Sequence, residues 1–165
     1  MKFLVNGDFN NHKLLQTILL FVLIYTVCLW FTNVLLYTEK IGFTKASVIE
    51  YYLGREEEFR NPVSYRGLLE GTHSHFFTFA IALLLVNHLT VFLDINQRLK
   101  FLLILVSCIS GFFDITSGWL IRFVSPMFAY LKIVSFVLFQ TSFLFLLVFS
   151  FMSLKIYRKG SLEDH

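Results

Sequence analysis

The uncharged stretch "LLQTILLFVLIYTVCLWFTNVLLY", residues 14–37, decides what kind of fold the chain can adopt. A helix that crosses the hydrocarbon core of a bilayer needs about 20 consecutive, mainly apolar residues. Three later stretches are also long and apolar enough, and the four predicted spans cover residues 14–37, 72–94, 101–122 and 128–156. We therefore predict an all-α membrane protein with one transmembrane domain over residues 1–165.

Composition supports this fold class and excludes an ordinary soluble domain. Of the 165 residues, 56% are hydrophobic and 15% are charged, so there are too few polar residues to cover a water-soluble surface. The net charge of +3 is small and gives no reason to expect nucleic acid as a partner. Cys28 and Cys108 lie within predicted spans, where thiols usually serve as packing residues, so we predict neither a disulfide nor a metal motif from them.

The connections between the spans predict the topology. The first span is longer than the apolar core of a signal peptide, and no small-x-small cleavage pattern follows it, so we expect it to be retained. The connections at residues 94–100 and 122–127 are short, and Pro126 suits the end of one helix and the start of the next. Short connections place consecutive helices side by side and antiparallel, which gives an up-down-up-down four-helix bundle.

The remaining connection, the outer loop of residues 38–71, is long enough to carry structure of its own. Thr44 is a suitable N-cap for a short helix, "KASVIEYYL", that Gly54 would end, and Ser64 is a second cap from which the next span can begin. The short helix has an apolar side, which suggests an interfacial position on the membrane surface; the apolar residues are Val48, Ile49, Tyr52 and Leu53.

Basic residues predict the orientation, because cytoplasmic segments carry an excess of Lys and Arg. The two termini and the second connection are basic and contain few acids, through Lys2, Lys13, Arg98, Lys100, Lys155, Arg158 and Lys159. The outer loop mixes its basic residues with six glutamates: Glu39, Glu50, Glu56, Glu57, Glu58 and Glu70. We predict that both termini are cytoplasmic and that the long loop lies outside.

Seven ionisable residues in or beside the spans carry the functional prediction. Such a side chain at membrane depth is costly, so it normally faces the bundle interior and has a partner or a task. Six of them map to the outer side, namely Glu70, His73, His75, Asp114, Arg122 and Lys132, and His88 belongs to the inner half. At about 100° per residue, Glu70 and His73 are neighbours, whereas His75 points about 160° from His73 unless the helix starts or breaks near Gly71.

Asp114 belongs to a stripe of small residues on the third span. Ser107, Gly111 and Gly118 recur at helical spacing on its side and allow another helix to approach closely. We therefore expect Asp114 to be buried between helices, with a histidine, an arginine or a metal ion as its partner.

A b-type haem is the first interpretation of these residues. The predicted haem-binding residues are His73, His75 and His88 as axial ligands, with Arg122 and Lys132 toward the propionates. No other predicted span contains a histidine, so a second axial ligand would come from elsewhere: His12, Met127 or the second span of a homodimer partner.

A non-haem metal ion is the second interpretation, and a structural network is the third. Fe, Cu or Zn would suit a mixed set of imidazole and carboxylate ligands, here Glu70, His73, His75 and Asp114. Glu70 and His73 have the Glu-x-x-His spacing of di-metal bundles, although those bundles take such ligands from four helices. Alternatively, Glu70, His73 and Asp114 are neutralised in a hydrogen-bonded network, with Arg122 and Lys132 as the cations, that fixes how the helices pack.

Several blocks between residues 51 and 132 resemble a family of small, uncharacterised bacterial inner-membrane proteins with four helices: "YYLGREEEF", "SYRGLLEGTHSHFF", "NHL" and "DITSGWLIRFVSPMFAYLK". The resemblance implies a location in the bacterial inner membrane. It also implies that the Glu-x-x-His-x-His block, with Glu70, His73 and His75, is the place to look for a site. It implies no activity.

Taken together, these features predict an integral membrane protein with a His-based haem or metal site near the outer face. It would act in electron transfer or metal handling, in the lipid bilayer and as a subunit of a larger complex. A quinone is a further candidate partner at this face. The alternative is a non-catalytic accessory or assembly subunit whose polar residues only stabilise helix packing. The sequence contains no Ser-His-Asp set, no phosphate-binding Gly loop and no nucleophile motif, so a redox-active chain would be an electron-transfer subunit and not a hydrolase.

Overall fold

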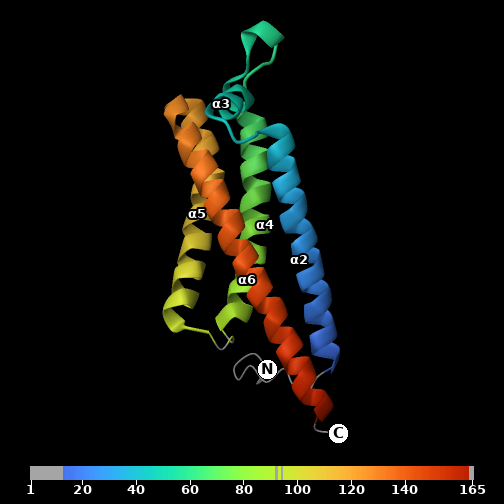
Figure 1. Cartoon of the computed structure of the whole chain (residues 1–165). Helices are drawn as coiled ribbons and strands as arrows, with labels where there is room; N and C mark the ends of the chain where they lie inside the picture. Colours follow the sequence, from blue (N-terminus) through green and yellow to red (C-terminus); the bar gives the residue numbers. More distant parts are fainter. Residues whose placement is uncertain (1–12, 92, 94, 164–165) are drawn as a thin grey trace.

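Four long helices account for most of the part of the chain that the computed structural model describes, residues 13–91, 93 and 95–163 (Figure 1). They are α2 (Lys13–Lys40), α4 (Tyr65–Val91), α5 (Gln97–Phe123) and α6 (Ala129–Glu163). Three shorter elements are α3 (Lys45–Leu53) and two 3-10 turns, η1 (Glu56–Glu58) and η2 (Pro126–Phe128). All four long helices are apolar enough to cross a membrane, which confirms the predicted all-α membrane fold.

Two of the long helices begin where a side-chain oxygen accepts a hydrogen bond from a first-turn amide. Ser64 Oγ accepts from the Gly67 amide (3.0 Å), so α4 starts directly after Ser64 and ahead of the predicted 72. Asn96 Oδ1 accepts from the Arg98 amide (2.8 Å), so α5 starts ahead of the predicted 101. The predicted spans covered only the apolar runs, whereas the observed helices extend to these caps in the polar flanks.

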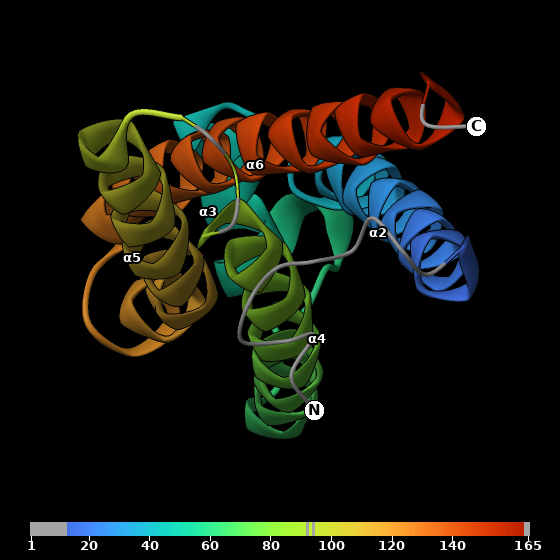
Figure 2. The same ribbon diagram turned by 90° about the horizontal axis from the view of Figure 1, so that it is seen from below.

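Helix α6 organises the bundle. It packs against α2, α4 and α5, whereas α2 packs mainly on α6, and α4 also packs on α5. Consecutive long helices run in opposite directions, as predicted, and α2 and α4 lie on the same side of α6 (Figure 2). One buried apolar cluster joins all four helices through Leu23, Phe79, Ile115, Phe139 and Leu146.

The short helix α3 closes one end of the bundle, which we call the α3 end (Figure 1). Thr44 and Ser47 form a capping box at its N-terminus, and Gly54 ends it with a φ of 79°, a conformation that favours glycine. Val48 and Tyr52 are buried, and α3 packs on α5 and α6. The predicted helix and both of its predicted ends are confirmed, and its contact with the membrane surface stays a prediction.

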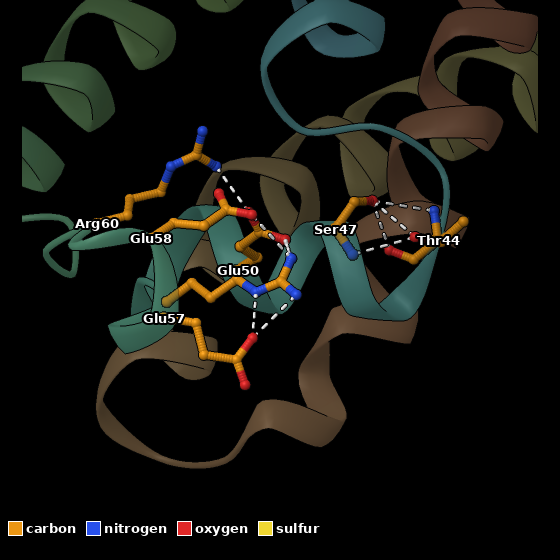
Figure 3. A network of polar contacts seen from close by, with 7 residues as sticks. Thr44, Ser47, Glu50, Glu57, Glu58 and Arg60 are labelled. Carbon is orange, nitrogen blue, oxygen red and sulfur yellow. Dashed lines mark hydrogen bonds and ion pairs between the residues drawn. The ribbon is translucent and has the colours of Figure 1, made fainter.

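A network of ion pairs orders the turn that follows α3 (Figure 3). The Arg55 guanidinium lies 3.6 Å from Glu50, 3.2 Å from Glu57 and 3.1 Å from Glu58, and that of Arg60 lies 3.1 Å from Glu50. The backbones of Arg55 and Arg60 also exchange hydrogen bonds of 2.9 and 3.0 Å across the turn. Exposed ion pairs each contribute little to stability, so the network mainly fixes the conformation of this turn.

Two glycines of α5 allow neighbouring side chains to approach its backbone. A Cβ atom at Gly118 would lie 2.8 Å from the Tyr52 ring, and a Cβ atom at Gly111 would lie 3.0 Å from the Phe139 ring. Gly71 in α4 is different, because nothing lies within 4 Å of the position that its Cβ would take. The stripe of small residues on α5 therefore receives α3 at Gly118 and α6 at Gly111, the close approach predicted for it.

We expect Gly118→Ala to destabilise the protein by roughly 1–3 kcal/mol, because the buried Tyr52 ring has to move away from the added methyl group. Gly71→Ala is the matched control. Its methyl group meets open space, and Ala is favoured over Gly in a helix by about 1 kcal/mol. Thermal unfolding of both variants in detergent measures the difference. Equal Tm values for the two variants would contradict the close packing of α3 on α5.

Candidate functional site

Asp114 and Lys132 form an ion pair inside the bundle. Lys132 Nζ donates to Asp114 Oδ1 (2.6 Å) and to the backbone carbonyl of Asp114 (2.9 Å). Both side chains are 8% exposed. Asp114 is thus buried between helices, as predicted, and its partner is a lysine of α6, where we expected a histidine, an arginine or a metal ion.

Tyrosines from two further elements surround this ion pair. The Lys132 ammonium lies 5.7 Å from the centre of the Tyr37 ring of α2, which stacks on Phe136 with the ring centres 3.5 Å apart. Burial raises the pKa of the Tyr52 hydroxyl, and the negative charge of Asp114 and then Tyr51 raise it further. Tyr52 is therefore neutral at physiological pH, and α2, α3, α5 and α6 together shield the ion pair from solvent.

The other predicted polar residues of the α3 end bind protein groups. Arg122 Nε donates to the backbone carbonyl of Val63 (3.2 Å), which ties α5 to the segment ahead of α4. Glu70 pairs with Arg66 (2.8 Å) on an exposed part of α4. The structure therefore brings Asp114 to Lys132 and brings neither of them to Glu70. Binding of propionates or other anions by Arg122 and Lys132 stays a prediction.

The three histidines of α4 lie in different surroundings. The helix runs without a break through Gly71, so His73 and His75 point to nearly opposite faces. All three side chains are exposed, and His73 and His88 lie on the outside of the bundle. This contradicts the expectation that an ionisable group at membrane depth faces the bundle interior. Only the faces of α4 that meet α5 and α6 are interior, and these two positions lie elsewhere.

The described residues contain no preformed cluster of metal-ligating side chains. Within residues 13–91, 93 and 95–163, His, Cys, Asp and Glu form no group of three or more that could hold one metal ion. His12, the predicted second axial ligand, lies outside the described residues. Haem b and a metal ion therefore stay predictions.

His75 lines a pocket of about 180 Å³ between α2, α4 and α6. The buried wall of the pocket includes Phe79 and Phe139, whose rings stack with their centres 4.4 Å apart, and the His75 ring packs edge-on against Phe79 (5.6 Å). Leu29 and Leu36 of α2 also line it and are 40% and 53% exposed. The pocket therefore opens on the side of the bundle that would face lipid.

Gln140 is the lining residue that the sequence interpretation missed. It is 6% exposed, and among the described residues its side-chain Nε2 and Oε1 atoms have no hydrogen-bond partner. Its backbone carbonyl is satisfied, because Trp30 Nε1 of α2 donates to it (3.1 Å). An unsatisfied buried amide costs about 1–3 kcal/mol. The available signal was a single glutamine in the middle of an otherwise apolar span.

The pocket has the chemistry of a site for a neutral ligand. Each of its three helices contributes an uncharged hydrogen-bonding side chain: Asn33 from α2, His75 from α4 and Gln140 from α6. No Asp, Glu, Lys or Arg is among the described residues that line it. Gln140 lies about 12 Å further along α6 than Lys132, so the pocket and the ion pair are separate sites.

Residues 42–161 of the chain match the model of a protein family, Aq_1264_TM, which is described as a transmembrane helical domain. No curated protein and no solved structure matches the chain at a significant level. The matched region contains both halves of the ion pair and the pocket residues His75 and Gln140.

We expect Lys132→Met to destabilise the protein by roughly 3–5 kcal/mol, because it leaves the buried Asp114 carboxylate without its counter-charge. The double variant Asp114→Asn with Lys132→Met removes both charges and is expected to recover part of this loss. Unfolding measurements on the wild type, both single variants and the double variant give the coupling free energy. Strictly additive effects would contradict direct pairing of the two side chains.

Proposed function

The chain belongs to this family of transmembrane helical domains and is a multi-pass membrane protein of the lipid bilayer, and we propose that it binds a non-protein ligand at His75 and acts in electron transfer. The bacterial inner membrane, with both termini in the cytoplasm and as part of a larger complex, is the proposed setting. In that orientation the pocket lies in the outer half of the membrane.

The observation that carries the proposal is the Gln140 amide, which is buried beside the pocket without a partner. Hydrocarbon supplies no hydrogen bonds, so this amide is costly until a ligand supplies them. His75 adds a ring nitrogen on the opposite helix, and aromatic rings form much of the wall. A ligand that inserts a polar group between α4 and α6 would satisfy both side chains.

Two electron-carrying groups are candidates for this ligand. Haem b would use His75 as an axial ligand, but a porphyrin is much larger than about 180 Å³, so α2 would have to move or a second chain would have to contribute. A quinone head group is smaller and needs no such movement. A metal ion at Glu70, His73, His75 and Asp114 has less support, because Glu70 pairs with Arg66 and Asp114 with Lys132.

A second candidate function is the non-catalytic accessory subunit. The observation in its favour is that Asp114, Lys132 and Arg122 all bind protein groups that join helices or loops. Under this reading the pocket holds only ordinary membrane lipid, and the polar residues serve packing alone.

We expect the protein, purified from membranes in mild detergent, to retain a small molecule other than membrane phospholipid at near one equivalent. The visible spectrum and metal analysis detect haem or metal, and mass spectrometry of a denaturing extract detects a colourless ligand. His75→Ala is expected to lower the retained amount about tenfold or more, because it removes a hydrogen-bonding group of the pocket. Thr141→Val is the matched control, since Thr141 neighbours Gln140 but is exposed and does not line the pocket.

Equal ligand content in the wild type and in the His75→Ala variant would contradict the proposed site. Recovery of phospholipid alone from both would favour the accessory subunit.

A further inference from the structure

We infer that the ligand of this pocket is the head group of a lipid-soluble quinone, with its hydrocarbon chain leaving between α2 and α4. The inference rests on the proposed function and specifies the chemical class of the ligand.

The lining selects a neutral ligand. The described lining residues include no carboxylate, ammonium or guanidinium group, so a phosphate or carboxylate head group would enter without a counter-charge. Burying such an unpaired charge is far more costly than burying a hydrogen-bonded neutral group. Phospholipids and fatty acids are therefore disfavoured, although they surround the protein in a membrane.

The polar side chains match a head group with oxygen atoms on more than one side. Gln140 can donate through Nε2 and accept through Oε1, and neutral His75 has one ring nitrogen that donates and one that accepts. Quinone carbonyl oxygens accept hydrogen bonds from the donors, and quinol hydroxyls donate to the acceptors. Gln140 and His75 come from different helices, and the Gln140 amide atoms are fully buried at the pocket wall. One head group can therefore bridge α6 and α4 in either redox form when the Gln140 side chain turns into the pocket. A simple alcohol would leave most of these groups unsatisfied.

The size and walls of the pocket fit a planar ring. Sites that enclose drug-sized molecules measure about 300–1,000 Å³, so a pocket of about 180 Å³ takes only a ring. Phe79 and Phe139 offer aromatic faces, and Trp30 of α2 adds an indole. The exposed leucines of α2, Leu29 and Leu36, mark the edge at which an isoprenoid chain would continue into lipid.

Trp30 provides a direct test, because quinones quench tryptophan fluorescence at short range. The chain contains two tryptophans, and Trp119 does not line the pocket but hydrogen-bonds to Thr72 on α4 (2.7 Å). Trp119→Phe therefore leaves Trp30 as the single reporter. In this background, detergent-solubilised full-length protein is titrated with a short-chain 1,4-benzoquinone, a 1,4-naphthoquinone and an alkylated arene of similar size without oxygen.

We expect saturable quenching by a quinone and none by the arene. Gln140→Leu is expected to weaken quinone binding about tenfold or more, and Thr141→Val to leave it unchanged. If Gln140→Leu fails to fold, as judged by circular dichroism and gel filtration, Asn33→Leu at the less buried α2 side of the pocket replaces it, with the same expected direction.

Quenching that rises linearly without saturation, or that is equal in the wild type and in the Gln140→Leu variant, would overturn the quinone inference. A different result contradicts the proposed function, namely a purified protein that retains no ligand. Recovery of haem or of another redox-active molecule in a His75-dependent manner leaves the proposed function standing and overturns only the quinone inference.

Discussion

Hydrocarbon gives a polar side chain nothing to bond to, and this constraint accounts for most of the polar contacts within the four spans. Asp114 is satisfied by Lys132, and hydroxyl groups of the spans bond to their own helix, as Thr90 does with the Val86 carbonyl (2.8 Å). Trp119 is satisfied by Thr72. Among the described residues, three side chains with buried polar atoms depart from this pattern, Tyr37, Asn87 and Gln140, and Gln140 is the one of them that lines the pocket.

The packing of the helices explains why Gln140 lacks a partner at this place in the bundle. Helix α6 packs against the other three long helices, but α2 packs mainly on α6 and leaves space beside α4. The pocket adjoins the middle of α6, where Gln140 is buried at its wall, while Phe79 and Phe139 keep the wall apolar. The ion pair of Asp114 and Lys132 lies nearer the α3 end, where α3 covers α5 and α6. Near the α3 end, the polar side chains of the bundle are thus satisfied by each other. The pocket between α2, α4 and α6 opens toward lipid, from which a ligand can enter.

The sequence was sufficient to predict the fold, because span length, short connections and caps are local properties. Thr44, Gly54 and Ser64 act as predicted, and the small residues around Asp114 predicted its burial. The structural-network interpretation included Lys132 among the possible cations, but the sequence could not single it out as the partner of Asp114, since that depends on how α6 is rotated relative to α5. The outward directions of His73 and His88 depend in the same way on which neighbours α4 finds. Gln140 was overlooked because one neutral amide hardly changes the hydropathy of a span.

The most direct test of the proposed ligand site is an experimental density map of the protein in nanodiscs that contain its native lipids. The account predicts density for a planar, non-protein group between His75 and Gln140, within hydrogen-bonding distance of the Gln140 amide, with a chain leaving beside Leu29 and Leu36. A map in which the Gln140 amide bonds to a protein side chain, and in which only acyl chains occupy the space between α2 and α4, would contradict it.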